Sequence, residues 1–172
     1  MKIREERPPN FAKIVKAFPL AIRPGVVFAY GDTIYSPGQS KLHTWLLAHE
    51  QVHLDRQKDP EAWWDRYIDD PVFRCFEEVL AHRREATVRA QSAGNLNRHQ
   101  RRALEKIMVE RLTQPLYRFE PLLRDTAKKL LTQASASDLL KIEGWLMGSA
   151  GSGGSPANTV TGPVPSDLLK LE

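Results

Sequence analysis

The chain has 172 residues, of which 41% are hydrophobic and 27% are charged, and its formal net charge is +4 at pH 7. This length suits one domain with a modest core, and the composition is typical of globular proteins rather than of disordered or fibrous ones. No apolar run approaches the ~20 residues that span a membrane, and residues 1–9 lack the apolar core of a secretory signal. We therefore expect no membrane partner.

The single cysteine argues against a disulfide-stabilised protein, and the pattern of charges argues against a nucleic-acid binder, although a net charge of +4 permits weak attraction to nucleic acid. Cys75 cannot form an intramolecular disulfide, which fits a reducing compartment, and its place in a helical pattern indicates a packing role. The arginines around His82 and Arg101 alternate with acidic residues, and they lack the interleaved aromatic side chains of a single-strand binder. We expect no nucleic-acid partner.

Short elements are predicted over the first forty residues. Residues 1–10 are charged and contain prolines, so we expect a loose N-terminal arm. Residues 11–18 carry apolar positions three and four apart, which predicts a short helix ending before Pro19. Residues 26–30 and 33–35 are apolar runs on either side of Gly31-Asp32, which predicts a β-hairpin with a two-residue turn.

The rest of the chain is predicted to be helical. Asp59-Pro60 and Asp70-Pro71 indicate helix starts, because a capping carboxylate precedes proline at the first helical position. The expected helices cover residues 40–57, the segment after Asp59 through Ile68, 71–91, 97–112, 122–133 and 137–147. The predicted fold class is therefore α+β and mainly α, with a short β-hairpin before the helix of residues 40–57.

The composition changes after Met147. Residues 148–156 are rich in glycine and serine, as a flexible linker is. The chain ends in residues 166–172, which closely repeat residues 137–143; two independent amphipathic turns would also produce this repeat. We divide the chain into an arm (1–10), a domain (11–147), and a linker with a C-terminal docking tail (148–172), which can occupy a groove on a partner.

The strongest chemical signal is His49-Glu50-Gln51-Val52-His53, a His-Glu-x-x-His motif inside a predicted helix. Positions four apart lie on one helical face, so both imidazoles can reach one metal ion. Glu50 follows the first histidine, where it can take a proton from water. Zn²⁺ suits this donor set. An alternative is an amphipathic helix with two solvent-facing histidines, but the apolar residues before the motif favour a buried helix.

A third protein ligand is needed, since two histidines alone hold zinc poorly. Glu78, Ala81, His82 and Glu85 form one stripe on the helix predicted after Pro71, so Glu78 is the best candidate. Glu77 and Glu85 remain alternative ligands. Asp55 or Glu85 can orient a ligand imidazole, as carboxylates commonly do.

With Glu78-x-x-Ala81-His82 after His49-Glu50-x-x-His53, the sequence resembles the glutamate-type zincins. Trp63-Trp64, Tyr67-Ile68 and Asp70-Pro71 resemble segments of small metallopeptidases encoded by tailed bacteriophages and prophages. The resemblance covers residues 20–92. It implies a minimal zincin-like helical domain, with His49, His53 and Glu78 as Zn²⁺ ligands and Glu50 as the general base. His82 departs from the family pattern, which usually has tyrosine or aspartate at this position.

The function expected from this resemblance is zinc-dependent hydrolysis of peptide bonds, with a protein or peptide as substrate. A donor for the developing oxyanion is also needed, and His82, Tyr67 and Tyr30 are the candidates. The hairpin is placed to align a substrate by edge pairing or to cap the helices. The alternative function is that of a phage structural or assembly protein, with a zincin-like scaffold and a tail that docks onto other virion subunits. The expected location is the bacterial cytoplasm or the virion.

Overall fold

The computed structural model describes residues 1–148, except for the side chains of Ala136, Glu143 and residues 145–148. Within this range it contains seven α-helices, two short 3-10 helices and one three-stranded sheet. The elements are β1 (Lys2–Arg4), α1 (Phe11–Ala17), η1 (Pro19–Ile22), β2 (Phe28–Tyr30), β3 (Thr33–Tyr35), α2 (Thr44–Arg56), α3 (Pro60–Asp69), α4 (Pro71–Ala93), α5 (Arg98–Leu112), η2 (Pro115–Tyr117), α6 (Pro121–Gln133) and α7 (Ala136–Gly148). The prediction of a mainly helical α+β fold is confirmed.

The sheet contains the predicted hairpin and one further strand, in the order β1-β3-β2. Strands β2 and β3 are antiparallel, and Tyr30 pairs with Thr33 across the two-residue turn. Gly31 in this turn has a φ of +64°, which glycine adopts without steric cost. The loose arm expected for residues 1–10 is wrong for residues 2–4, which pair in parallel with β3 as β1.

Carboxylate caps begin the two helices that follow the motif, as the sequence predicts. The Asp59 side chain accepts from the N–H groups of Glu61 and Ala62, at 3.0 and 3.1 Å. Asp70 accepts in the same way from Val72 and Phe73, at 2.9 and 3.0 Å. Each cap precedes a proline at the first helical position. Because Asp70 and Pro71 begin a new helix, α4 starts only two residues after α3 ends at Asp69.

The helix of the histidine motif begins later than expected, at Thr44 instead of residue 40. His43 before it is extended, with φ −67° and ψ 144°, and its ring stacks on that of Trp45 at 4.9 Å. No described helix is both long and apolar enough to cross a membrane. The predicted linker and docking tail lie outside the described residues, apart from the backbone of Gly148 at the end of α7.

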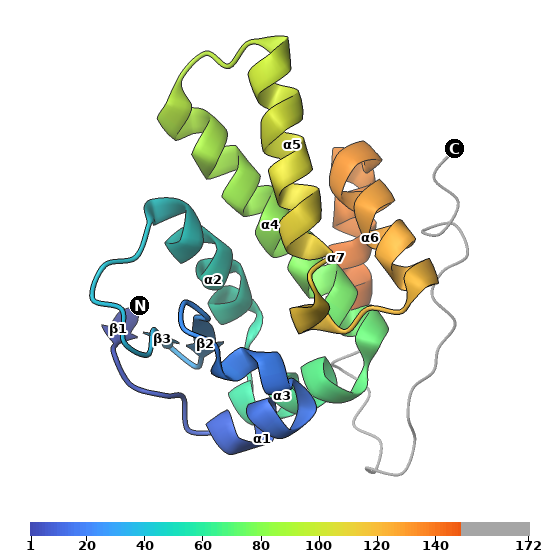
Figure 1. The fold of residues 1–172 in the computed structure, drawn as a ribbon. Coiled ribbons are helices and arrows are strands. Elements are labelled where there is room, and N and C mark those ends of the chain that lie inside the picture. Colours follow the sequence, from blue (N-terminus) through green and yellow to red (C-terminus); the bar gives the residue numbers. More distant parts are fainter. Residues whose placement is uncertain (149–172) are drawn as a thin grey trace.

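The helices surround α4, which is the central element of the fold (Figure 1). Helix α2 lies along one side of α4, α6 and α7 lie on the other, and α5 returns antiparallel to α4 as a helical hairpin. The sheet and α1 pack near α2 and α3. The main core joins these layers; its most buried large side chains include Ile14, Phe76, Met108, Leu112 and Leu130.

Two buried polar side chains fasten the layers around the site. Gln57, after α2, accepts from the Gly31 N–H at 3.0 Å and donates to the Ala29 carbonyl at 3.1 Å, so it fixes the hairpin to α2. Arg74 in α4 donates to the carbonyls of Tyr67, at 2.6 Å, and Tyr117, at 3.0 Å. Arg74 therefore holds the end of α3 and the short helix η2 against α4.

Candidate metal centre

The candidate centre lies between α2 and α4, which pack side by side (Figure 1). His49, Glu50 and His53 on α2 are only 4–5% exposed. Glu78, His82 and Glu85 on α4 are 0–2% exposed. Burying so many ionisable groups is costly unless they bind each other or an ion. This burial excludes the alternative of two solvent-facing histidines.

The Glu78 carboxylate lies at the middle of this cluster. Its Oε2 lies 3.6 Å from His49 Nε2 and 3.8 Å from His82 Nε2. Its Oε1 lies 3.4 Å from His53 Nε2. The structure therefore places both motif histidines near Glu78 and adds His82. Among the described residues, the group whose ligand atoms all lie close enough for one ion is His49, Glu78 and His82, without His53.

The group has donor atoms suitable for a metal ion. One ligand atom from each of His49, Glu78 and His82 lies within 4.8 Å of the others. Glu78 Oε2 is buried and has no hydrogen-bond partner among the described residues, which fits an oxygen that serves as a metal ligand. Imidazole and carboxylate donors suit several divalent transition metals.

Two outer carboxylates face the other nitrogen of each imidazole. Glu85 Oε2 lies 3.1 Å from His82 Nδ1 and 3.4 Å from His49 Nδ1. Glu77 Oε2 lies 3.7 Å from His53 Nδ1, and Glu77 also binds Arg56 at 2.9 Å. An Nδ1–H directed at a carboxylate leaves Nε2 as the free nitrogen, so these contacts present all three Nε2 atoms to Glu78.

These contacts answer the question of which carboxylates orient the ligands. Of the two residues that the sequence proposes, Glu85 contacts the histidines, whereas Asp55 is exposed and accepts from Gln51 at 2.5 Å. Glu77 and Glu85, the alternative third ligands, both lie behind the imidazoles, on the side away from Glu78.

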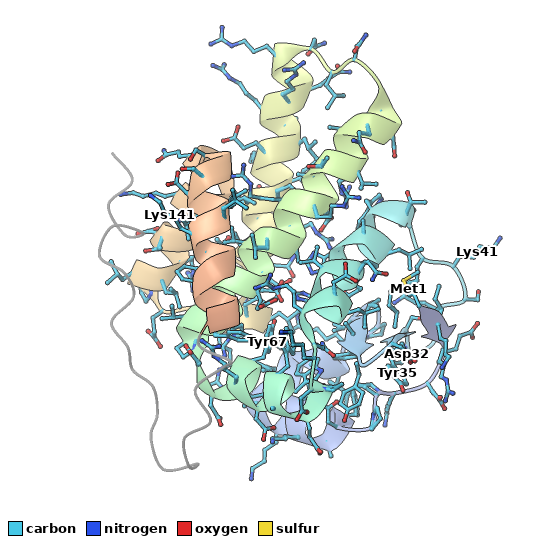
Figure 2. All side chains as sticks on the ribbon, turned by 180° about the vertical axis from the view of Figure 1, so that it is seen from behind. Met1, Asp32, Tyr35, Lys41, Tyr67 and Lys141 are labelled. Carbon is cyan, nitrogen blue, oxygen red and sulfur yellow. The ribbon has the colours of Figure 1, made fainter. Side chains whose placement is uncertain are left out.

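Two tyrosines complete the wall of the centre. Tyr67 donates to Glu78 Oε1 at 2.5 Å and, as Figure 2 shows, lies in the interior of the molecule. Tyr117 in η2 places its hydroxyl 3.2 Å from His82 Nε2. Of the oxyanion donors proposed from sequence, Tyr67 is thus engaged with Glu78, while Tyr30 lies at the hairpin end near Glu61 and Asp59. Tyr117 is a residue that the sequence reasoning missed.

Two cavities meet at His49 and Glu50. A small one, about 80 Å³, is lined mainly by apolar side chains such as Phe28 and Trp63. A larger one, about 420 Å³, also has Arg23 and Arg111 among its lining residues. Glu50 therefore faces the space from which a ligand would approach the centre.

The buried cluster shifts the pKa values of its members. Burial raises the pKa of Glu50 to about 8. Burial lowers the pKa of His49 to about 4, although Glu85 opposes this effect. Burial also acts to lower the pKa of His53, but the contacts with Glu77 and Glu78 outweigh it and raise this pKa to about 10. In the metal-free protein, the two motif histidines thus differ in charge at neutral pH.

The hairpin edge is closed to a pairing peptide at its centre. The Ala29 carbonyl in the edge strand β2 accepts from Gln57 at 3.1 Å and from Trp64 Nε1 at 2.9 Å. Strand β3 lies between β1 and β2, so both of its sides are paired. Of the hairpin sequence, Val26 and Val27 before β2 line the larger cavity.

Comparisons with protein-family models, with curated proteins and with solved structures gave no match. The function is therefore inferred from the chemistry of the buried centre.

Proposed function

We propose that the protein is a zinc-dependent metallopeptidase of the glutamate-zincin kind, with a protein or peptide as substrate. The proposal is supported chiefly by one observation: His49 and His53 converge on Glu78 while Glu50 lines the cavities beside them. The resemblance of the two motifs to those of small phage-encoded metallopeptidases points the same way.

The donor set of the centre fits Zn²⁺. His49 and His53 offer neutral nitrogens once the ion displaces protons, and Glu78 offers an unpartnered carboxylate oxygen. A bound Zn²⁺ polarises a substrate carbonyl and lowers the pKa of water towards ~7. Tyr67 holds the Glu78 carboxylate in position through its 2.5 Å hydrogen bond.

Glu50 is the proposed general base. Burial raises the pKa of its carboxyl to about 8 in the metal-free protein. A cation bound beside it would lower this pKa and favour the carboxylate form that accepts a proton. In the proposed reaction Glu50 takes a proton from the attacking water and passes it to the leaving amine. The small cavity beside it is lined mainly by apolar side chains. A substrate that fills it would displace water and so strengthen electrostatic interactions within the site.

The test is the variant Glu50→Gln, which keeps the size of the side chain but cannot accept a proton. Zinc-loaded wild-type protein should cleave unfolded protein substrates, and the variant should be about a hundred- to ten-thousand-fold slower, because that is what a positioned general base contributes. Zinc content, measured by elemental analysis, should be the same in both. Asp55→Asn, an exposed change on the same helix, is the matched control and should retain activity.

An active Glu50→Gln variant would overturn the mechanism. A wild-type protein that binds zinc but cleaves neither unfolded nor phage-derived substrates would instead favour the alternative function, a zincin-like scaffold in phage assembly.

A further inference from the structure

We propose that His82 is a fourth protein ligand, so that the centre has three imidazoles and one carboxylate. The inference rests on the metal site of the proposed function but not on peptide hydrolysis. A fourth protein ligand is not part of the pattern that the sequence resembles, in which two histidines and one glutamate hold the metal.

The first support is geometric. His82 Nε2 faces Glu78 Oε2 at 3.8 Å, almost as close as His49 Nε2 at 3.6 Å. The rings of His49 and His82 lie 4.6 Å apart, nearer than the 5.1 Å between those of His49 and His53. By position alone, His82 is as good a ligand as either histidine of the motif.

The second support comes from the shared outer carboxylate. Glu85 Oε2 contacts Nδ1 of both His49 and His82, at 3.4 and 3.1 Å. One carboxylate thus holds both rings in the same orientation. In each ring Nδ1 faces Glu85 and Nε2 faces Oε2 of Glu78. Glu85 is itself held by Arg89 at 2.9 Å and Arg111 at 3.2 Å, so it retains its negative charge. Such outer partners are typical of metal-binding histidines.

The third support is the burial of His82. It is 0% exposed, and its described contacts are polar: Glu85, Glu78 and the Tyr117 hydroxyl. In the metal-free structure Tyr117 is the hydrogen-bond partner of Nε2, at 3.2 Å. Metal binding would exchange this phenol for the ion. Tyr117 would then be free to face the cavities that it lines.

A fourth protein ligand changes what the centre can do. Four protein donors fill a tetrahedral ion and leave no position for water. Hydrolysis at this centre would therefore require at least five-coordination, whereas a four-coordinate ion would be structural.

The experiment measures metal binding, so it needs no substrate. Zinc affinity is measured by competition with a chelator for wild type, His82→Ala, His82→Gln and His53→Ala. Each variant should bind more weakly by more than the ~10–100-fold that loss of an outer partner costs. X-ray absorption of the zinc-loaded protein should show three imidazoles in wild type and two in each variant. His99→Gln, which changes an exposed histidine on α5, is the matched control and should bind zinc as wild type does.

The outcomes are separable. If the His82 variants bind zinc as tightly as wild type, and the wild-type spectrum shows only two imidazoles, the inference is overturned. The ligand set is then His49, His53 and Glu78. An unchanged affinity in His53→Ala would overturn the inference too, with His49, Glu78 and His82 as the ligands. Thermal unfolding of each metal-free variant identifies loss of fold, and the more conservative His82→Gln then carries the test. Absence of peptidase activity would bear on the proposed function alone.

Discussion

Glu85 links several of the charged groups around the centre. Its carboxylate contacts two imidazoles and two guanidinium groups while being 0% exposed. Burial acts to raise its pKa, but the contacts with His49 and His82 lower it well below its usual range. Glu85 therefore stays ionised throughout the neutral range and can orient both rings.

The variant Glu85→Gln should lower zinc affinity about 10–100-fold, because an amide orients an imidazole less strongly than a carboxylate does. Chelator competition measures the effect. Glu105→Gln, an exposed change on α5, is the control and should bind as wild type does. Equal affinity in Glu85→Gln and wild type would show that Glu85 does not position the ligands.

Cys75 gives a prediction about alkaline stability. It is buried in α4, and burial raises the pKa of its thiol from 9.0 to about 12. Above pH 9 the unfolded chain releases the proton that the folded protein keeps, so the free energy of unfolding falls as pH rises. Relative to Cys75→Ala, wild type should lose about 1.4 kcal/mol per pH unit between pH 9 and the folded pKa. Urea unfolding at several pH values measures the difference, and parallel pH profiles of the two proteins would contradict it.

Some residues of the centre could be predicted from the sequence, and others could not. The sequence indicates His49, Glu50, His53 and Glu78 because helical spacing is a local property. Tyr117 lies in a short helix far along the chain, and only the fold brings its hydroxyl to His82. The sequence contains no local signal for such a contact.

At the level of elements, Arg74 joins three segments by donating to backbone carbonyls. Its contacts with Tyr67, Ile68 and Tyr117 fasten α3 and η2 to α4, and both tyrosine side chains reach the centre. The ring of Phe18 also lies against its guanidinium, at 5.0 Å. Arg74 is therefore a structural support of the site.

Arg74→Met should destabilise the fold by about 3 kcal/mol, since several buried carbonyls lose their donor. Zinc affinity should fall as well, because Tyr67, which holds the Glu78 carboxylate, loses its anchor. Urea unfolding and chelator competition measure the two effects. Arg84→Met, an exposed change on the same helix, is the control. A cost below about 1 kcal/mol, the net contribution of a typical single hydrogen bond, would contradict the assignment.

Helix starts were predictable, whereas the third strand was not. Asp59 and Asp70 cap their helices through N–H groups two and three residues away, so their role is visible in a short window of sequence. Strand β1 pairs with β3, which follows two intervening helices and a strand. A parallel partner so distant leaves no pattern in residues 2–4.

At the level of the whole molecule, the described core ends with Ile142 in α7, which is 0% exposed. The tail predicted from sequence lies beyond this point and remains a prediction. If it is a docking element, deletion of residues 148–172 should leave the melting temperature and zinc affinity unchanged, because every described core side chain is retained. Calorimetry and chelator competition measure both. A fall of several degrees in melting temperature would show that the tail belongs to the domain.

The two edges of the sheet affect how the protein behaves in concentrated solution. An open strand edge invites pairing with other chains and so promotes aggregation. On one edge, Gln57 and Trp64 occupy the Ala29 carbonyl; on the other, β1 is short and carries Lys2 and Arg4. Both edges are therefore poor templates. Loss of Gln57, which also anchors the hairpin to the helix of the histidine motif, would leave only Trp64 on the Ala29 carbonyl and so make this edge more open to intermolecular β-pairing.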